Sequence, residues 1–171
     1  MKQGTLMSIA DFKKATSTKK SEGGFKKKNK KKEENVQMKV CEYLKDEYPD
    51  VIFTCDLSSG MKLPIHIAAK NKEMRSSRAL PDLTIYELSK EYSSPTKGPN
   101  PVRYIKTYSG LVIEIKSEDT IIYKKDGTIR KNEHLEEQNE ILRRLTEKGY
   151  KAVFGIGFEA CKKIIDDYLK K

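Results

Sequence analysis

The chain has 171 residues, of which 36% are apolar and 35% charged, with a formal net charge of +10. This length is enough for one domain with a hydrophobic core. No apolar run approaches the ~20 residues that span a bilayer, so we expect a cytoplasmic protein with no membrane contact and no export signal. The three cysteines are widely spaced in apolar contexts, which disfavours both a disulfide framework and a cysteine-ligated metal.

Residues 1–32 form a basic segment that contains eleven lysines and only two acidic residues, Asp11 and Glu22. It therefore holds nearly all of the net charge. It has too little apolar surface to offset the entropy of ordering it, so we predict a disordered tail that binds polyanions, above all nucleic acid. A leader that only improves solubility is the alternative, because lysine runs attract any phosphate polymer.

The domain is predicted to begin at residue 33 with an amphipathic helix that ends before Pro49. Its apolar stripe includes Val36, Val40 and Leu44, which recur at helical spacing. At 100° per residue Glu33 falls beside this stripe, so its side chain is predicted to face inward. Gln37 lies one turn later on the same edge.

Residues 51–57 and 81–88 are predicted strands, and the segment 61–78 between them reads as a basic connector with about one helical turn. A proline-rich insertion over about 89–109 is predicted to leave the core. Residues 111–117, "LVIEIKS", return to the sheet as a buried strand.

The last third of the chain predicts a hairpin, a helix, a strand and a closing helix. Asp126-Gly127 marks the hairpin turn. The next helix places His134 and Gln138 on its apolar face and ends at Gly149. A strand over 151–157 and an amphipathic helix to the end complete an α/β fold, in which a central mixed β-sheet is flanked by helices.

Three charged side chains stand out on the predicted sheet. Glu114 and Lys116 alternate with apolar residues and so share one face of their strand. Taken alone they would most often be a surface ion pair. Asp82, at the start of another strand, is placed to converge with Glu114. Two carboxylates brought together favour a divalent cation between them, and oxygen ligands favour Mg²⁺ or Mn²⁺.

Basic residues precede Asp82 along the chain. Lys70, Lys72, Arg75 and Arg78 are predicted to contact a DNA backbone, although a solvated connector is about as good an interpretation. His134 is predicted to lie at the helix start or on a phosphate, with a proton shuttle as the minor alternative.

The pattern Pro81-Asp82 … Glu114-Ile115-Lys116 resembles the signature of the PD-(D/E)XK nucleases. The flanking motifs narrow the resemblance to the VRR-NUC branch found in phage and bacterial proteins. They are the helix opening Glu33 … Val36-Gln37, the strand Gly110 to Lys116, the run His134 to Gln138, and the segment Leu145 to Gly157. The likeness covers the chain from about residue 33 to its end. The long Asp82–Glu114 separation and the absence of a glycine just before Pro81 depart from the pattern.

The resemblance implies a restriction-endonuclease-like core that hydrolyses phosphodiester bonds with Mg²⁺ or Mn²⁺. It assigns the metal to Asp82, Glu114 and the main-chain carbonyl of Ile115, with Glu33 reaching it directly or through water. Lys116 would orient or activate the attacking water and stabilise the phosphate charge. Gln138 would hold Lys116 or the phosphate.

We therefore expect a DNA endonuclease selective for branched, flapped or four-way DNA, in a bacterial cell or a phage-infected host. A homodimer would suit symmetric cutting of a junction. Two alternatives remain open: a non-catalytic nucleic-acid-binding module, and a phage accessory protein that docks through its basic tail.

Overall fold

The fold is built around a four-stranded mixed sheet. The computed structural model describes residues 23–56, 64–92 and 105–170. The sheet has the order β1-β2-β5-β6, in which β5 pairs antiparallel to β2 and parallel to β6. Its strands are β1 (Phe53–Cys55), β2 (Leu83–Ile85), β5 (Leu111–Lys116) and β6 (Lys151–Ile156).

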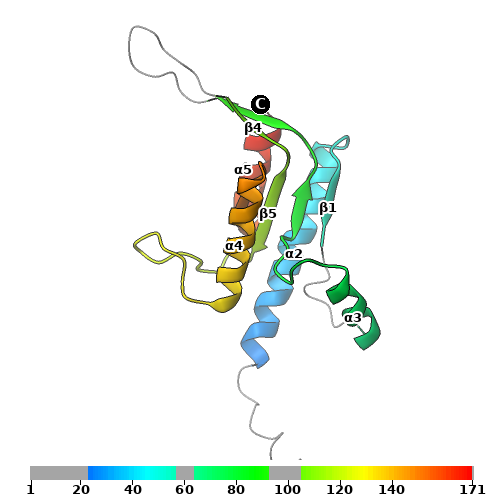
Figure 1. Cartoon of the computed structure of the whole chain (residues 1–171), viewed down its shortest axis with the longest axis vertical. Helices are drawn as coiled ribbons and strands as arrows, with labels where there is room; N and C mark the ends of the chain where they lie inside the picture. The colour runs from blue at the N-terminus through cyan, green and yellow to red at the C-terminus, as the bar shows by residue number, and fades with distance from the viewer. Residues whose placement is uncertain (1–22, 57–63, 93–104, 171) are drawn as a thin grey trace, which may run out of the picture.

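Helices cover both faces of this sheet, as Figure 1 shows. Two of them, α2 (Gly23–Glu47) and α5 (Gly157–Leu169), pack against each other and against β5. The third, α4 (Glu133–Glu147), packs on β6. This arrangement confirms the predicted α/β architecture with a mixed sheet between helices.

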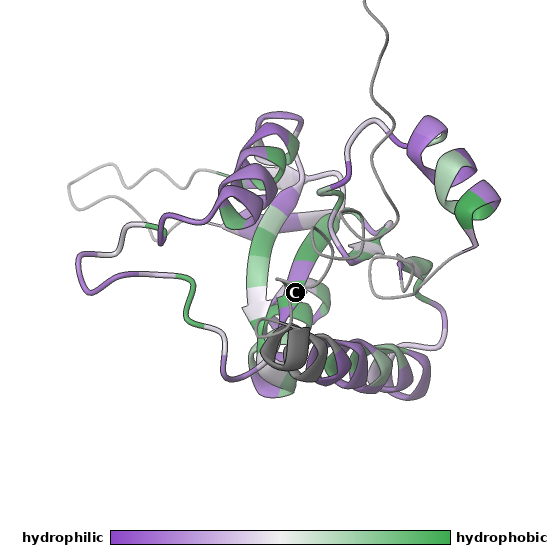
Figure 2. Ribbon diagram, turned by 90° about the horizontal axis from the view of Figure 1, so that it is seen from below, coloured by the Kyte–Doolittle hydropathy of each residue, from purple (hydrophilic) through white to green (hydrophobic). Residues whose placement is uncertain are grey.

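The main core lies between β5 and the α2/α5 layer. Leu111, Ile113 and Ile115 project from one face of β5 toward Val40 and Ile165, and all five side chains are essentially inaccessible to solvent. Burial of a large aliphatic side chain contributes about 1.5–3 kcal/mol, so this layer is the main source of cohesion. Figure 2 shows the apolar residues gathered on the central strands and the polar ones on the outer sides of the helices.

The other face of β5 carries polar chemistry. Val112, Glu114 and Lys116 alternate with the core residues and lie on the side of α4, yet all three are buried. The alternation predicted from "LVIEIKS" is thus confirmed, and the two charges are enclosed rather than exposed at a wet surface.

The N-terminal boundary predicted at residue 33 is wrong, because α2 begins at Gly23. From Phe25 to Glu47 the chain contains neither glycine nor proline, and lysine is a good helix former. The helix therefore extends through the lysine run that we had assigned to a disordered tail. The rest of that tail, residues 1–22, lies outside the described residues.

The predicted proline-rich insertion is in part regular structure. Its two ends form an antiparallel ribbon of β3 (Ser89–Tyr92) and β4 (Ile105–Tyr108), a second sheet separate from the first. Residues 93–104, which hold the prolines, lie outside the described residues.

The basic connector folds as α3 (Ile65–Glu73), longer than the single turn predicted. None of its residues is buried, and Figures 1 and 2 show it standing apart from the sheet. Asp126-Gly127 forms the predicted turn, with a positive φ of 80° at Gly127 and one antiparallel bridge between Tyr123 and Ile129. No helix within the described part of the chain is both long and apolar enough to cross a membrane.

Candidate active site

Strand register brings Asp82 and Glu114 together. In the β2/β5 ladder Leu83 pairs with Ile113, so the next antiparallel step sets Asp82 opposite Glu114. Residues opposite each other in such a ladder project from the same face of the sheet, with Cβ atoms about 5 Å apart. Two carboxylates separated by more than thirty positions in the sequence therefore meet at one end of the sheet.

Asp82 also occupies the place of a missing strand partner. Paired β2 residues begin at Leu83, so the main-chain N–H of Ile115 would have no acceptor on that side. The Asp82 side chain supplies one: its Oδ2 accepts from Ile115 N at 2.8 Å. Because a buried N–H must find an acceptor, this bond fixes the carboxylate beside β5.

Glu114 is held between two donors. Its Oε1 accepts from Lys116 Nζ at 2.8 Å and from Gln138 Nε2 on α4. The side chains of Glu114 and Lys116 are only 3% and 8% exposed, so this ion pair is shielded from water. The second carboxylate oxygen, Oε2, is buried without a hydrogen-bond partner. Such an atom is costly unless a ligand or a proton satisfies it.

The environment works against two ionised carboxylates. The pKa of Glu114 is raised to about 8, chiefly by burial and also by the charge of Asp82, against the opposing effect of Lys116. Burial likewise raises the pKa of Asp82 to about 6, in spite of the bond from Ile115. A cation placed between the two acids would relieve both effects.

Glu33 approaches from the helix layer on the opposite face of the sheet. It lies on α2 one turn before the buried Gln37 and is close enough that its charge raises the pKa of both Asp82 and Glu114. Within residues 23–56, 64–92 and 105–170, however, no three Asp, Glu, His or Cys side chains are gathered closely enough to hold a metal ion.

The start of α4 positions Gln138 and His134. The Asn132 side chain caps the helix by accepting from the main-chain N–H groups of His134 and Leu135, at 3.0 and 3.2 Å. On this helix Gln138 is buried toward Glu114, and His134 lies one turn before it, nearer the N-terminus of α4. Gln138 Nε2 lies 3.1 Å from His134 Nε2.

The predicted DNA-binding residues divide into two groups. Lys70 and Lys72 are exposed on α3. Arg75 and Arg78 instead form ion pairs within the protein: Arg75 with Asp56, and Arg78 with Glu137 at 2.6 Å and with Glu133 at 3.4 Å. These acidic partners of Arg78 were not predicted, because they lie more than fifty positions farther along the chain.

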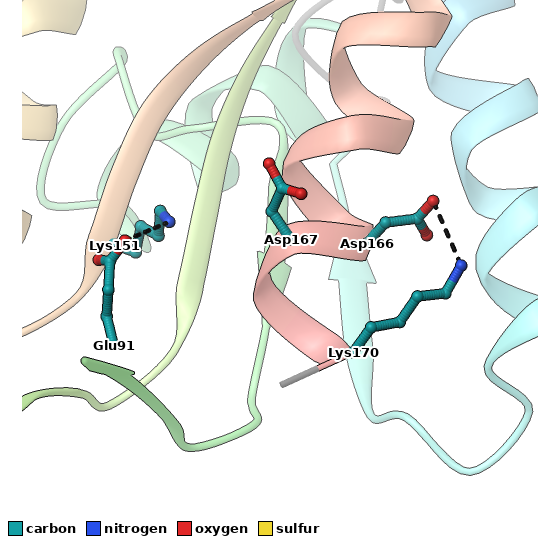
Figure 3. Close-up of a pocket in the computed structure, with 5 residues that line it drawn as sticks. All are labelled: Glu91, Lys151, Asp166, Asp167 and Lys170. Atoms are coloured by element: carbon teal, nitrogen blue, oxygen red, sulfur yellow. Dashed lines mark ion pairs between the residues drawn. The ribbon is translucent and has the colours of Figure 1, made fainter. Parts of the chain in front are cut away.

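A second group of charged residues lies at the opposite end of β5 and β6. Figure 3 shows a pocket of about 430 Å³ lined by Glu91, Lys151, Asp166, Asp167 and Lys170. Lys151 pairs with Leu111 at the start of both strands, whereas Lys116 pairs with Ile156 at their far end. This pocket is thus remote from the buried carboxylates. Its charges form ion pairs, including Lys170 with Asp166 at 3.4 Å.

No protein-family model matches the sequence, and no curated protein matches it. Among solved structures, one described as a VRR_NUC domain protein is similar to this chain, with 24% sequence identity and a TM-score of 0.49. The alignment covers 81% of this chain and 88% of the other.

Proposed function

We propose that this chain is a divalent-metal-dependent deoxyribonuclease that hydrolyses phosphodiester bonds. The observation that carries the proposal is the convergence of Asp82 and Glu114 at one end of the sheet, with the Lys116 ammonium beside them. A purely structural ion pair would not need a second buried carboxylate, nor would it leave Glu114 Oε2 without a partner. This combination fits a site built to bind a cation next to a phosphate.

The ligands suit Mg²⁺ or Mn²⁺. Mg²⁺ is commonly bound by one or two carboxylates and keeps several waters, so two acids and the Ile115 carbonyl are a sufficient set, with Glu33 acting directly or through water. When bound, the ion would supply Lewis acidity at the phosphate and lower the pKa of a water. The raised pKa values of Asp82 and Glu114 support such a role, because a cation there replaces two protons.

The protein side chains have separable roles in this proposal. Lys116 neutralises Glu114 and presents its ammonium group where negative charge grows on the phosphate during attack. Gln138 holds the Glu114 carboxylate in one orientation through its amide N–H. Asp82 is oriented by the main chain of β5 and does not depend on a flexible partner.

The proposed substrate is DNA that contains a branch, a flap or a four-way junction, contacted by exposed lysines of α3. The exposed Lys70 and Lys72 lie on that helix, and the lysine run at the start of α2 precedes Glu33. Phosphate contacts of this kind add affinity without sequence preference. A homodimer on such a substrate stays a prediction.

Cleavage assays with purified protein test the proposal. Wild type is expected to cut branched or flapped DNA with Mg²⁺ and to be inactive in EDTA. Asp82→Asn and Lys116→Ala should each lower the rate by about 10²–10⁴-fold, because each removes charge from the reaction centre. Lys124→Ala, an exposed lysine in the 120–130 hairpin, is the matched control and should cut as wild type does.

The same assay separates this function from the non-catalytic alternative. A nucleic-acid-binding module would bind the DNA but leave it intact with Mg²⁺ present. Equal cleavage by wild type and Lys116→Ala would place the chemistry elsewhere in the preparation and reject the proposed site.

A further inference from the structure

Beside the buried carboxylates lies a pocket that the proposed hydrolysis does not itself require. It has a volume of about 490 Å³ and is lined by the segment 71–78 and by His134. This volume falls in the ~300–1,000 Å³ range of pockets that enclose a small organic ligand. A phosphate group alone would leave most of it unfilled.

Ion pairs hold the wall of this pocket in place. The adjoining helix α3 buries no residue, so packing alone does not fix segment 71–78. Instead, Arg75 pairs with Asp56. Arg78 forms a bidentate ion pair with Glu137, with its Nε and Nη2 at 2.9 and 2.6 Å from the two carboxylate oxygens. Both guanidinium groups are thus already matched by carboxylates. Among the lining cations Lys72 and Arg78 are exposed, and Arg78 is already paired with Glu137.

The pocket connects to the active site through two side chains. The Gln138 amide nitrogen is a donor, so at 3.1 Å the His134 Nε2 is the acceptor and the ring carries its proton on Nδ1. The same amide nitrogen donates to Glu114 Oε1. A ligand in contact with His134 would therefore lie one residue away from the group that positions the catalytic carboxylate.

Besides its three cations, the lining carries neutral polar groups, and these indicate what the ligand is. Asn71 offers an amide and Ser76 a hydroxyl, which are groups that hydrogen-bond to the edge of a nucleobase. In a duplex that edge is paired and the base is stacked, so only a base that has left the duplex can enter a concave pocket.

We infer that this pocket receives one unpaired nucleotide of the substrate strand, next to the bond that is cut. The inference rests on the proposed nuclease function and extends it: selection of branched or flapped DNA comes from an unpaired base in the pocket. Lys72 meets the phosphate of that nucleotide, and Asn71 with Ser76 meets its base.

Binding to metal-free protein tests the inference without relying on cleavage. Fluorescence anisotropy in EDTA compares a blunt duplex with a duplex of equal nucleotide count that ends in a short single-stranded extension. Full-length wild type should bind the extended DNA about tenfold more tightly. Any contribution of the lysine-rich residues 1–32 enters both affinities and largely cancels in their ratio.

Variants of the lining residues test whether the ratio of the two affinities, extended over blunt DNA, depends on the pocket. Asn71→Ala, Ser76→Ala and Lys72→Ala should each reduce it to about threefold or less, because each removes a contact that only the unpaired nucleotide makes. Asn139→Ala is the matched control, since Asn139 lies on the side of α4 that faces a different pocket, and it should keep the wild-type ratio. Circular dichroism at the same concentration verifies that each variant is folded.

Two results would overturn the inference: equal binding of blunt and extended DNA by wild type, or a full wild-type ratio in both Asn71→Ala and Ser76→Ala. If the protein cuts DNA in Mg²⁺ but shows either result, the proposed nuclease function stands and the inference about the pocket is rejected. Conversely, if the protein prefers the extended DNA but cuts nothing, the pocket stands as a binding site and the catalytic proposal is rejected.

Discussion

Glu114 is the residue on which most contacts of the site converge. Lys116 and Gln138 both donate to its Oε1, while its Oε2 is buried without a partner. A carboxylate in this position is stable only if a proton or a cation shares it. The residue therefore links the pH, the metal and the stability of the folded protein.

The first prediction concerns pH and follows from the direction of this shift. The pKa of Glu114 rises from an ordinary 4.5 to about 8 in the folded chain, chiefly through burial. Between these values the folded protein binds more protons than the unfolded one, so the free energy of unfolding falls as pH rises. Urea titrations of metal-free protein should show a loss of at least about 1 kcal/mol between about pH 5 and pH 8.

Mg²⁺ added at the higher pH should restore most of that loss, because it takes the place of the protons. Glu114→Gln removes the titrating group and should flatten the dependence over this pH range. A wild-type protein whose unfolding midpoint is the same at both pH values, with no response to Mg²⁺, would contradict the buried acid pair.

The second prediction concerns Gln138 as a positioning residue. Gln138→Ala leaves Lys116 and Asp82 in place but frees the Glu114 carboxylate to rotate. Loss of such a supporting bond to a metal ligand lowers affinity or activity by about 10–100-fold. Cleavage rates measured against Mg²⁺ concentration should show a weaker apparent metal affinity, while Asn139→Ala shows none; an unchanged Mg²⁺ dependence would deny Gln138 this role.

At the scale of elements, the position of Glu33 depends on the contacts between α2, which carries it, and α5. Asp166 on α5 accepts from Tyr43 and Tyr48, at 2.5 and 2.6 Å, and from Lys162 at 2.9 Å. The aromatic rings of Tyr43 and Phe158 also meet edge to face across this junction. One carboxylate thus joins the helix that carries Glu33 to the helix packed against β5.

The third prediction tests this junction. Burial opposes ionisation of Asp166, but bonds from Tyr43, Tyr48 and Lys162 outweigh it and lower its pKa. A lowered pKa contributes stability above the unfolded value of about 3.8, and that stability is lost as pH falls below it. Asp166→Asn should therefore lower the free energy of unfolding by about 1–2 kcal/mol at neutral pH and by much less in acid, as measured by urea denaturation.

Asp167→Asn is the matched control for this change. Asp167 is the neighbouring residue on α5, its side chain is 56% exposed, and it pairs with Lys163 on the surface. Exposed pairs of this kind contribute less than about 1 kcal/mol, so the control should be close to wild type. Similar losses in both variants would mean that Asp166 has no special part in joining the helices.

At the scale of the whole molecule, most of the net positive charge belongs to the sequence before Glu33. The backbone of residues 23–32 continues α2 toward its N-terminus, so the lysine run is attached through a helix to Glu33. Lys32 forms an ion pair with Asp119, in the loop that follows the catalytic strand. The lysines of this run are therefore part of the domain that holds the carboxylates.

The fourth prediction separates this run from the residues before it. Residues 1–22 contain five lysines and two acids, whereas the run contains Lys26, Lys27, Lys28 and Lys30 within eight residues of Glu33. Replacing these four lysines with glutamine should reduce the slope of log K against log salt by about 3, since each phosphate contact contributes about 0.9. Deleting residues 1–22 should change it less. The reverse order would mean that the preceding segment carries the DNA contacts.

Much of this protein could be predicted from its sequence, because local patterns control the local structure. Alternation in "LVIEIKS" identified a strand with apolar residues on one face and Glu114 with Lys116 on the other, and β5 confirms it. Helical spacing likewise placed Gln138 on the inner face of its helix. The extent of α2 was misjudged because lysine density was taken to mean disorder, although lysine also favours helix.

Tertiary structure alone decided what the polar groups contact. That Asp82 lies opposite Glu114 depends on the register between two strands, and register is set by packing rather than by either strand alone. The pairing of Arg78 with Glu137 brings together segments far apart in the chain, and no local pattern could indicate it. Sequence periodicity determines which side of an element a residue faces, whereas the fold determines which residue it meets there.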